Sequence, residues 1–180
     1  MKLPLLIRKL ICTFQGTKWL SDDDVVFQEG FDDCGEACLR MTLRFFELPG
    51  ELRKEAVRFR PNGLSLLDIT DALKDFELET IGFQFSSLDE LKKILAQDNK
   101  IAPLIVLKGF HIPHVYTGLG HLVMLVGLTD QYAELKDPSL GHIRLFKERL
   151  NKKWTGKCLL VYSKETAEKC PKHFSSRLKG

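Results

Sequence analysis

The chain of 180 residues lacks the apolar runs that would cross a membrane or serve as a secretion signal. A membrane-spanning helix needs roughly 18 or more consecutive apolar residues. The apolar run near the N-terminus, Leu3–Ile7, is interrupted by Arg8 and Lys9, and no small-residue cleavage site follows it. We therefore interpret residues 1–24 as an N-terminal arm or short helix that packs on a soluble protein. A loose association with a membrane surface is the less favoured alternative.

Neither positive nor negative charge is in strong excess. The chain also has no internal repeats and no low-complexity segments. Its 27 basic and 24 acidic residues give a net charge of +3, which is too small to indicate nucleic acid as a partner. The five cysteines are an odd, scattered set rather than a disulfide framework, so we expect a reducing compartment and a cytoplasmic protein. At 44% hydrophobic residues, the chain can bury one core, in one domain or in two lobes.

The most informative segment is residues 28–46, QEGFDDCGEACLRMTLRFF. Cys34 precedes Gly35 at the start of an amphipathic helix whose apolar residues recur at the helical period: Ala37, Cys38, Met41, Phe45 and Leu48. A thiol at a helix N-terminus lies at the positive end of the helix dipole, which favours the thiolate and so a nucleophile. Gln28, six residues upstream, is a candidate donor to an oxyanion. This arrangement is typical of a cysteine hydrolase.

Residues 25–100 are predicted to be mostly helical, and residues 101–163 mostly strands. In the first part we expect a strand-like Val25–Phe27, helices at Glu51–Phe59, Ser65–Phe76 and from Ser87 to Leu95, and a strand at Leu78–Phe85. Ser65 with Asp68 and Ser87 with Glu90 are spaced as N-terminal capping boxes. In the second part we expect strands at Pro103–Leu107, His121–Leu128, Tyr132–Lys136, His142–Leu145 and Lys157–Tyr162, and a short helix at Phe146–Trp154.

Short strands joined by turns favour an antiparallel sheet, so we predict an α+β fold. A helical lobe (25–100) and a β lobe (101–163) would enclose an active-site cleft between them, and residues 164–180 would form a C-terminal tail.

The candidate base and its orienting group lie in the second part of the chain. His121 begins one predicted strand and Asp137 ends the next, just before Pro138. In a hairpin, the start of one strand lies beside the end of the next, so we expect the two side chains to be cross-strand neighbours. The carboxylate would hold one imidazole nitrogen and leave the other for the thiol of Cys34, as in a catalytic triad.

Five segments, in this order, resemble the bacteriocin-processing cysteine peptidases that cleave double-glycine leader peptides: QEGFDDCGEACLRM, NGLSLLDITDALKDFELE, GHLVMLVGL, KDPSLG and KKWTGKCLLVY. The resemblance covers about residues 25 to 163. It implies a papain-like fold, cleavage after a Gly-Gly pair, a Cys-His-Asp triad and a glutamine in the oxyanion hole, with no metal or cofactor. These roles fall on Cys34, His121, Asp137 and Gln28.

The resemblance further implies contacts between substrate and the residues beside the nucleophile and the base. We expect those contacts at Asp33, Gly35 and Gly120. The lead-in to His121, Lys108–Gly120, is longer than is usual in the family, so we expect it to influence substrate choice.

In the family, this domain usually stands at the N-terminus of a peptide-exporting ABC transporter. The present sequence has neither membrane helices nor a nucleotide-binding P-loop, so we expect a stand-alone peptidase. The predicted partners are a peptide or protein substrate, with a Gly-Gly motif as the candidate recognition element, and a membrane transporter.

Several alternatives stay open at this point. Relatives that have lost the nucleophile bind peptides without cleaving them, and the same triad also supports acyl transfer or isopeptide hydrolysis. A zinc site built from Cys34, Cys38, His111 and His114 is a weaker rival, because the spacing of the two cysteines is not that of a zinc knuckle. Cys34 as a small buried residue without chemistry is the remaining alternative.

Overall fold

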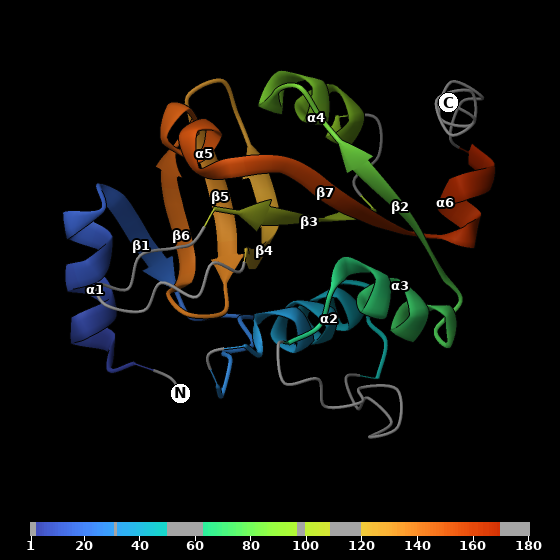
Figure 1. Cartoon of the computed structure of the whole chain (residues 1–180), viewed down its shortest axis with the longest axis horizontal. Coiled ribbons are helices and arrows are strands. Elements are labelled where there is room, and N and C mark those ends of the chain that lie inside the picture. Colours follow the sequence, from blue (N-terminus) through green and yellow to red (C-terminus); the bar gives the residue numbers. More distant parts are fainter. Residues whose placement is uncertain (1–2, 31, 50–62, 97–99, 109–119, 170–180) are drawn as a thin grey trace.

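The computed structural model describes residues 3–30, 32–49, 63–96, 100–108 and 120–169. Within these residues, seven strands form one antiparallel sheet (Figure 1). In spatial order they are β1 (Thr17–Ser21), β6 (Gly141–Phe146), β5 (Tyr132–Asp137), β4 (His121–Leu128), β3 (Ile101–Leu107), β7 (Trp154–Ser163) and β2 (Leu78–Gln84). The α+β prediction with an antiparallel sheet is confirmed. The two edge strands come from the first half of the chain, and the five central strands come from the second half.

Helices cover both faces of this sheet. In Figure 1, α2 (Cys34–Phe45) and α3 (Leu66–Lys74) lie below the sheet, and α4 (Leu88–Leu95) and α5 (Lys147–Lys153) lie above it. The remaining helices, α1 (Leu5–Phe14) and α6 (Lys164–Lys169), lie at opposite ends of the molecule.

The central strands are apolar on both sides because both faces are covered. Along β4, Leu122 and Met124 pack in the cluster that includes α2 and α3, whereas Val123 and Leu125 pack in the cluster on the opposite face. All four side chains are at most 5% exposed. Successive residues of a strand point to opposite faces, so a continuous apolar run is what a doubly covered strand requires. The strand was predicted from this apolar run at His121–Leu128, and β4 has the same bounds.

Both predicted helix caps are present. At the start of α3, the Ser65 hydroxyl accepts a hydrogen bond from the backbone of Asp68, and the Asp68 carboxylate accepts one from the backbone of Ser65. At the start of α4, Ser87 accepts from the Glu90 backbone, while the Glu90 carboxylate accepts from the backbone of Ser86 instead. The second cap is therefore one residue wider than a standard capping box.

Two details of the predicted elements are wrong. Val25–Phe27 does not form a strand; its side chains pack in the cluster with α2 and α3, and none of the strands in the described part of the chain pairs with it. The first strand is instead Thr17–Ser21, which was not predicted and pairs with β6. The helix expected at Glu51–Phe59 lies outside the described residues.

The N-terminal arm is a helix that is anchored by one buried arginine. The Arg8 side chain is 1% exposed and donates two hydrogen bonds to the Asp22 carboxylate, at 2.6 and 2.7 Å. It also donates to the Leu140 carbonyl at 3.2 Å and lies over the Phe27 ring at 4.6 Å. The helix is therefore fixed to the turn after β5 and to the segment that leads to Gln28.

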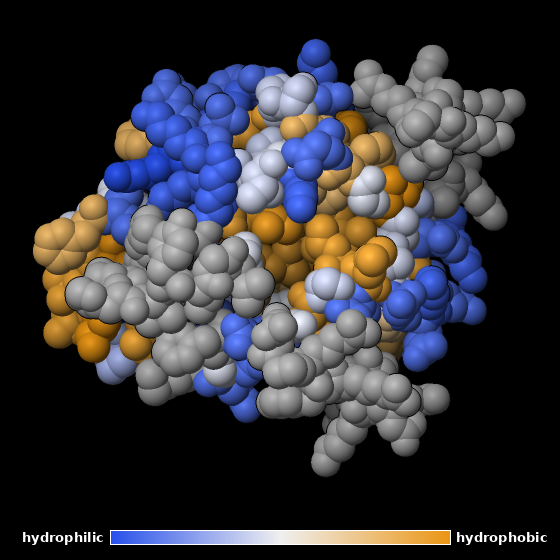
Figure 2. Space-filling model, viewed as in Figure 1, coloured by the Kyte–Doolittle hydropathy of each residue, from blue (hydrophilic) through white to orange (hydrophobic). Residues whose placement is uncertain are grey.

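The outer side of α1 is apolar and exposed, as the orange surface at the left of Figure 2 shows. The exposed large hydrophobic residues of α1 are Leu5, Leu6, Ile7, Leu10 and Phe14. Among the described residues, no helix combines the length and the apolar character that crossing a bilayer requires.

Candidate active site

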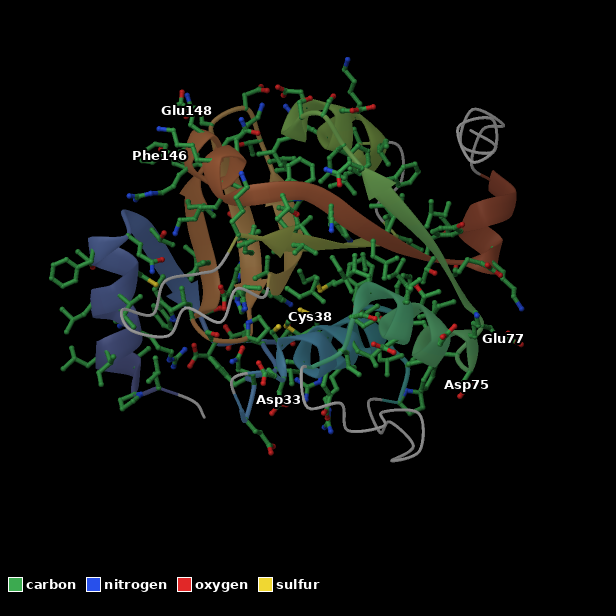
Figure 3. The ribbon with its side chains drawn as sticks, viewed as in Figure 1. Asp33, Cys38, Asp75, Glu77, Phe146 and Glu148 are labelled. Atoms are coloured by element: carbon green, nitrogen blue, oxygen red, sulfur yellow. The ribbon has the colours of Figure 1, made fainter. Side chains whose placement is uncertain are left out.

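Cys34 is the first residue of α2, and the packing of this helix on β4 determines where the thiol lies. Four residues on, the Cys38 sulfur donates a hydrogen bond to the Leu122 carbonyl at 3.4 Å (Figure 3 labels Cys38 on the side of the helix that faces the sheet). At the residue next to Cys34, a Cβ added to Gly35 would lie 2.8 Å from the Cβ of Leu64 and 2.9 Å from the carbonyl oxygen of Leu64. Only glycine allows this close approach, so the first turn of α2 is held tightly from two sides.

The predicted cross-strand pair is present. His121 is the first residue of β4 and Asp137 is the last residue of β5, in a register that pairs Met124 with Lys136. The His121 Nε2 atom lies 3.0 Å from the Asp137 Oδ1 atom. Nε2 faces the carboxylate, and the electrostatics of Cys34 and His121 are coupled by a side-chain hydrogen bond between the two residues. The contact between His121 and Asp137 therefore has the geometry that was predicted, and the roles of the three side chains stay predictions.

Asp137 is held rigidly in the protein interior. Its side chain is 0% exposed, and Oδ1 accepts hydrogen bonds from the backbone N–H groups of Ser139 at 2.7 Å and Leu140 at 3.1 Å, in addition to the contact with His121. Asp137 Oδ2 has no hydrogen-bond partner among the described residues. Burying a carboxylate with one oxygen unpaired is costly unless a positive charge lies beside it. His121 is positioned to supply that charge.

The electrostatics of the pair favour a thiolate and an imidazolium. Burial opposes the charge on His121, but the charge of Asp137 and the hydrogen bonds with Asp137 and Cys34 raise the pKa of His121 from 6.5 to about 10. Burial likewise opposes the thiolate, yet the pKa of Cys34 is lowered, because His121 and the Leu122 backbone N–H hydrogen-bond to its sulfur. The dipole of α2 acts in the same direction. The lowered pKa of Cys34 beside His121 is the electrostatic property that a nucleophilic thiol would need.

The other described cysteines have the opposite character. Burial raises the pKa of Cys12 to about 11, and it raises the pKa values of Cys38 and Cys158 further. These three are small, buried core residues. Cys34 alone among the four has a lowered pKa.

Gln28 is fixed beside the turn that follows Asp137. Its backbone N–H donates to the Pro138 carbonyl at 3.1 Å, and its side-chain Oε1 accepts from the Ser139 hydroxyl at 3.0 Å. Its Nε2 donates to the Gly30 carbonyl at 2.8 Å. The amide thus has a defined orientation, with Oε1 toward Ser139 and Nε2 directed away from it.

The residues predicted to contact substrate have structural contacts of their own. Asp33, labelled at the start of α2 in Figure 3, accepts a hydrogen bond from the Gly30 N–H at 2.6 Å and so shapes the loop that holds Gln28. Gly120 is exposed, and a Cβ there would lie 2.5 Å from Cγ1 of Val106. Gly35 packs against Leu64, as described above. Their roles toward substrate stay predictions.

Ser139 is the site residue that the sequence analysis did not identify. Its backbone contacts Asp137 and its hydroxyl contacts Gln28, so it lies between two of the predicted functional residues. The segment KDPSLG contained a usable signal, because an aspartate side chain commonly accepts from the backbone two residues further on. The contact between Ser139 and Gln28 had no such signal, since 111 residues separate the two.

The zinc alternative receives no support from the described residues. No group of three or more histidine, cysteine, aspartate or glutamate side chains among them is arranged to hold a metal ion. Cys38 is fully buried against Leu122, and His111 and His114 lie outside the described residues.

Comparison with known proteins decides the family. Residues 22–166 match the Peptidase C39 family. The chain belongs to this family. It is a cysteine-type peptidase with a papain-like fold, and the helix α1 and strand β1 lie before the matched region.

Solved structures of C39 peptidases have the same fold. One is the double-glycine-motif protease of an AMS/PCAT transporter in complex with its leader peptide, which is 23% identical with a TM-score of 0.60, over 77% of this chain and 90% of that one. Another is the peptidase domain of Streptococcus ComA, a bifunctional ABC transporter of a quorum-sensing pathway, which is 21% identical with a TM-score of 0.63, over 78% of this chain and 98% of that one.

A curated relative of this C39 peptidase is a much longer protein. It is the Mycoplasma genitalium protein MG390, named as an ABC transporter ATP-binding protein, which is 29% identical over 136 residues. The match covers 73% of this chain and 18% of that relative, so the chain spans under a fifth of the relative's length.

Proposed function

We propose that this C39 peptidase hydrolyses a peptide bond after a small-residue, Gly-Gly-like junction, with Cys34 as nucleophile and His121 as base. The observation that carries the proposal is the position of His121, whose Nε2 lies 3.0 Å from the buried Asp137 carboxylate and which lowers the pKa of the Cys34 thiol at the start of α2. An imidazole between a thiol and a buried carboxylate is the arrangement that nucleophilic catalysis requires.

In the acylation step, the Cys34 thiolate attacks the carbonyl carbon of the scissile bond and forms a C–S bond. The protonated His121 then gives its proton to the departing amine as the C–N bond breaks, which leaves a thioester on Cys34. Asp137 keeps the imidazole in one orientation and stabilises its positive charge until the proton is transferred.

In the deacylation step, His121 is neutral and accepts a proton from a water molecule. The resulting hydroxide attacks the thioester, the C–S bond breaks, and the peptide leaves with a new carboxyl terminus. The Cys34 thiolate and the His121 imidazolium are thereby restored, so the pair is ready for another substrate.

Gln28 is the proposed donor to the oxyanion in both steps, together with the backbone N–H of Cys34. Its amide is held in one orientation by Ser139 at Oε1 and by the Gly30 carbonyl at Nε2, which supports a preorganised donor. A single such donor contributes on the order of 3 kcal/mol to the stability of the transition state.

The substrate class and the partner are proposed from the relatives. The AMS/PCAT protease is described in complex with a leader peptide, and MG390 is named as part of an ABC transporter. We propose that the natural substrate is likewise a leader peptide that ends in a Gly-Gly-like pair and that a membrane transporter receives the product. The four described cysteines are free thiols, which supports the proposed cytoplasmic location.

The test is to incubate wild type and Cys34→Ala with peptides that differ only at the junction, and to identify the products by mass spectrometry. The junctions are Gly-Gly, Gly-Ala and Leu-Leu. We expect wild type to cleave after Gly-Gly and Cys34→Ala to cleave nothing. Binding of the Gly-Gly peptide by both proteins without cleavage by either would contradict the proposal and favour an inert peptide-binding module. Transfer of the acyl group to an added amine in preference to water would favour an acyl transferase.

A further inference from the structure

Ser139 makes two hydrogen bonds, one through its backbone N–H and one through its hydroxyl. Its backbone N–H donates to Asp137 Oδ1 at 2.7 Å, and its hydroxyl donates to Gln28 Oε1 at 3.0 Å. Pro138, the residue before it, accepts from the Gln28 backbone at 3.1 Å. The turn after β5 therefore touches both Asp137, the proposed orienting group of the base, and Gln28, the proposed oxyanion donor.

We infer that Ser139 is a positioning residue that fixes the orientation of the Gln28 amide and so sets the strength of the oxyanion donor. This inference rests on the proposed function, because it assigns a role within the same site. Ser139 acts through Gln28 and does not itself contact the reacting atoms.

The Ser139 hydroxyl determines which way the Gln28 side-chain amide points. Because Ser139 donates to Oε1, the Nε2 end must point the other way, where the Gly30 carbonyl accepts from it at 2.8 Å. The Gly30 backbone is held in turn by the Asp33 carboxylate at 2.6 Å. A hydrogen bond to the oxygen of an amide also polarises its N–H groups, which makes them stronger donors.

The contact with Asp137 is independent of the hydroxyl. It comes from the backbone, so a change of the Ser139 side chain leaves it in place. Loss of the hydroxyl should therefore weaken the oxyanion site without moving the pH dependence that the His121–Asp137 pair controls. This separation gives a readout that general damage to the site would not reproduce.

The probe is a peptide aldehyde that ends in Gly-Gly-H. Its carbonyl adds reversibly to the Cys34 sulfur, and the resulting hemithioacetal places an oxygen where the oxyanion forms, without any need for turnover. We expect Gln28→Ala to weaken aldehyde binding about 10- to 100-fold. Ser139→Ala should weaken it about 3- to 10-fold, the cost of one hydrogen bond. Ser139→Thr, which keeps the hydroxyl, should stay within about 2-fold of wild type.

The decisive comparison is the double variant. If Ser139 acts through Gln28, then Ser139→Ala should change aldehyde binding by less than about 2-fold in the Gln28→Ala background. The exposed Ser86, whose hydroxyl contacts Glu90 far from the site, provides the matched control in Ser86→Ala. Wild-type affinity in Ser139→Ala, or its full effect in the Gln28→Ala background, would overturn the inference. Failure of wild type to cleave Gly-Gly peptides would instead overturn the proposed function, since aldehyde capture does not depend on cleavage.

Discussion

The Nε2 atom of His121 lies 3.0 Å from Oδ1 of Asp137, across sixteen residues of sequence and between adjacent strands. The carboxylate is fully buried and its Oδ1 also accepts two backbone N–H groups of the following turn. The imidazole is 12% exposed, so water screens the pair only weakly. This pairing raises the pKa of His121 to about 10 and supplies the positive charge that stabilises the Cys34 thiolate.

The first prediction concerns Asp137→Asn. The asparagine keeps an oxygen for the N–H groups of Ser139 and Leu140, and its NH₂ group occupies the place of Oδ2, which has no partner among the described residues. The fold should therefore survive. Without the negative charge, His121 should lose its proton more easily, and cleavage should fall by about 100- to 10,000-fold.

The measurement is kcat/KM for a Gly-Gly peptide as a function of pH. Folding raises the pKa of His121 from 6.5 to about 10. Protonation of His121 therefore stabilises the folded protein fully below pH 6.5, and this stabilisation is lost as the pH rises through about 10. The alkaline limb of the wild-type profile should accordingly lie near 10, and that of Asp137→Asn should move toward 6.5. An alkaline limb in the same place in both proteins would show that Asp137 does not control the charge of His121.

The second prediction concerns the reactivity of the cysteines. At about pH 6, a low dose of iodoacetamide should alkylate Cys34 before the other described cysteines, because only a thiolate reacts and only Cys34 has a lowered pKa. Cys12, Cys38 and Cys158 are buried with raised pKa values and should react slowly. Peptide mapping by mass spectrometry gives the order. Equal, slow labelling of Cys34 and Cys38 would argue against an activated thiol.

The third prediction concerns the anchor of α1. Arg8→Ala removes a buried guanidinium that pairs with Asp22 and donates to Leu140, and it takes the cation away from a carboxylate that is 30% exposed. We expect the free energy of unfolding in urea to fall by about 2–4 kcal/mol. Arg40→Ala is the matched control, because Arg40 pairs with Glu36 on the surface of α2. Its effect should stay within about 0.5 kcal/mol. Equal losses in the two variants would contradict the role of Arg8 as an anchor.

The fourth prediction compares two glycines. A Cβ at Gly35 would lie 2.9 Å from the Leu64 carbonyl oxygen, so Gly35→Ala must move backbone. It should lower the free energy of unfolding by about 1–3 kcal/mol. No described atom lies within 4 Å of a Cβ at Gly82, and Gly82→Ala on β2 should be neutral or stabilise by up to about 1 kcal/mol. Thermal or urea unfolding should therefore show a clear loss of stability in Gly35→Ala and none in Gly82→Ala, and a stabilising Gly35→Ala would refute the close packing of α2 on Leu64.

Local pattern was sufficient to predict the central elements of the fold. The helix that starts at Cys34, the caps at Ser65 and Ser87, and the strand His121–Leu128 each depend on a few neighbouring residues. The pairing of His121 with Asp137 was also accessible, because a tight hairpin brings together residues that are close in sequence. The turn signals between the strands therefore carried most of the information about the site.

Long-range contacts explain what the sequence did not reveal. Strand β1 has five residues and owes its conformation to β6, which lies more than a hundred positions later. The contact of Arg8 with Leu140 spans 132 positions, and that of Ser139 with Gln28 spans 111. No periodicity or spacing within one segment encodes such a pair. Val25–Phe27 shows the converse, since a β-branched run without a neighbouring strand to pair with remains irregular.

In the proposed mechanism, Cys34 attacks the substrate carbonyl with His121 as its base. Trapping the thioester is the most direct measurement of this attack. Wild type, Cys34→Ala and His121→Ala are mixed with a Gly-Gly peptide, quenched with acid within one turnover, and examined by intact-protein and peptide-level mass spectrometry. We expect an acyl adduct that ends at the Gly-Gly pair on Cys34 of wild type, and none in either variant. An adduct of equal yield in His121→Ala, or cleavage by wild type with the acyl group on a different residue, would contradict the mechanism.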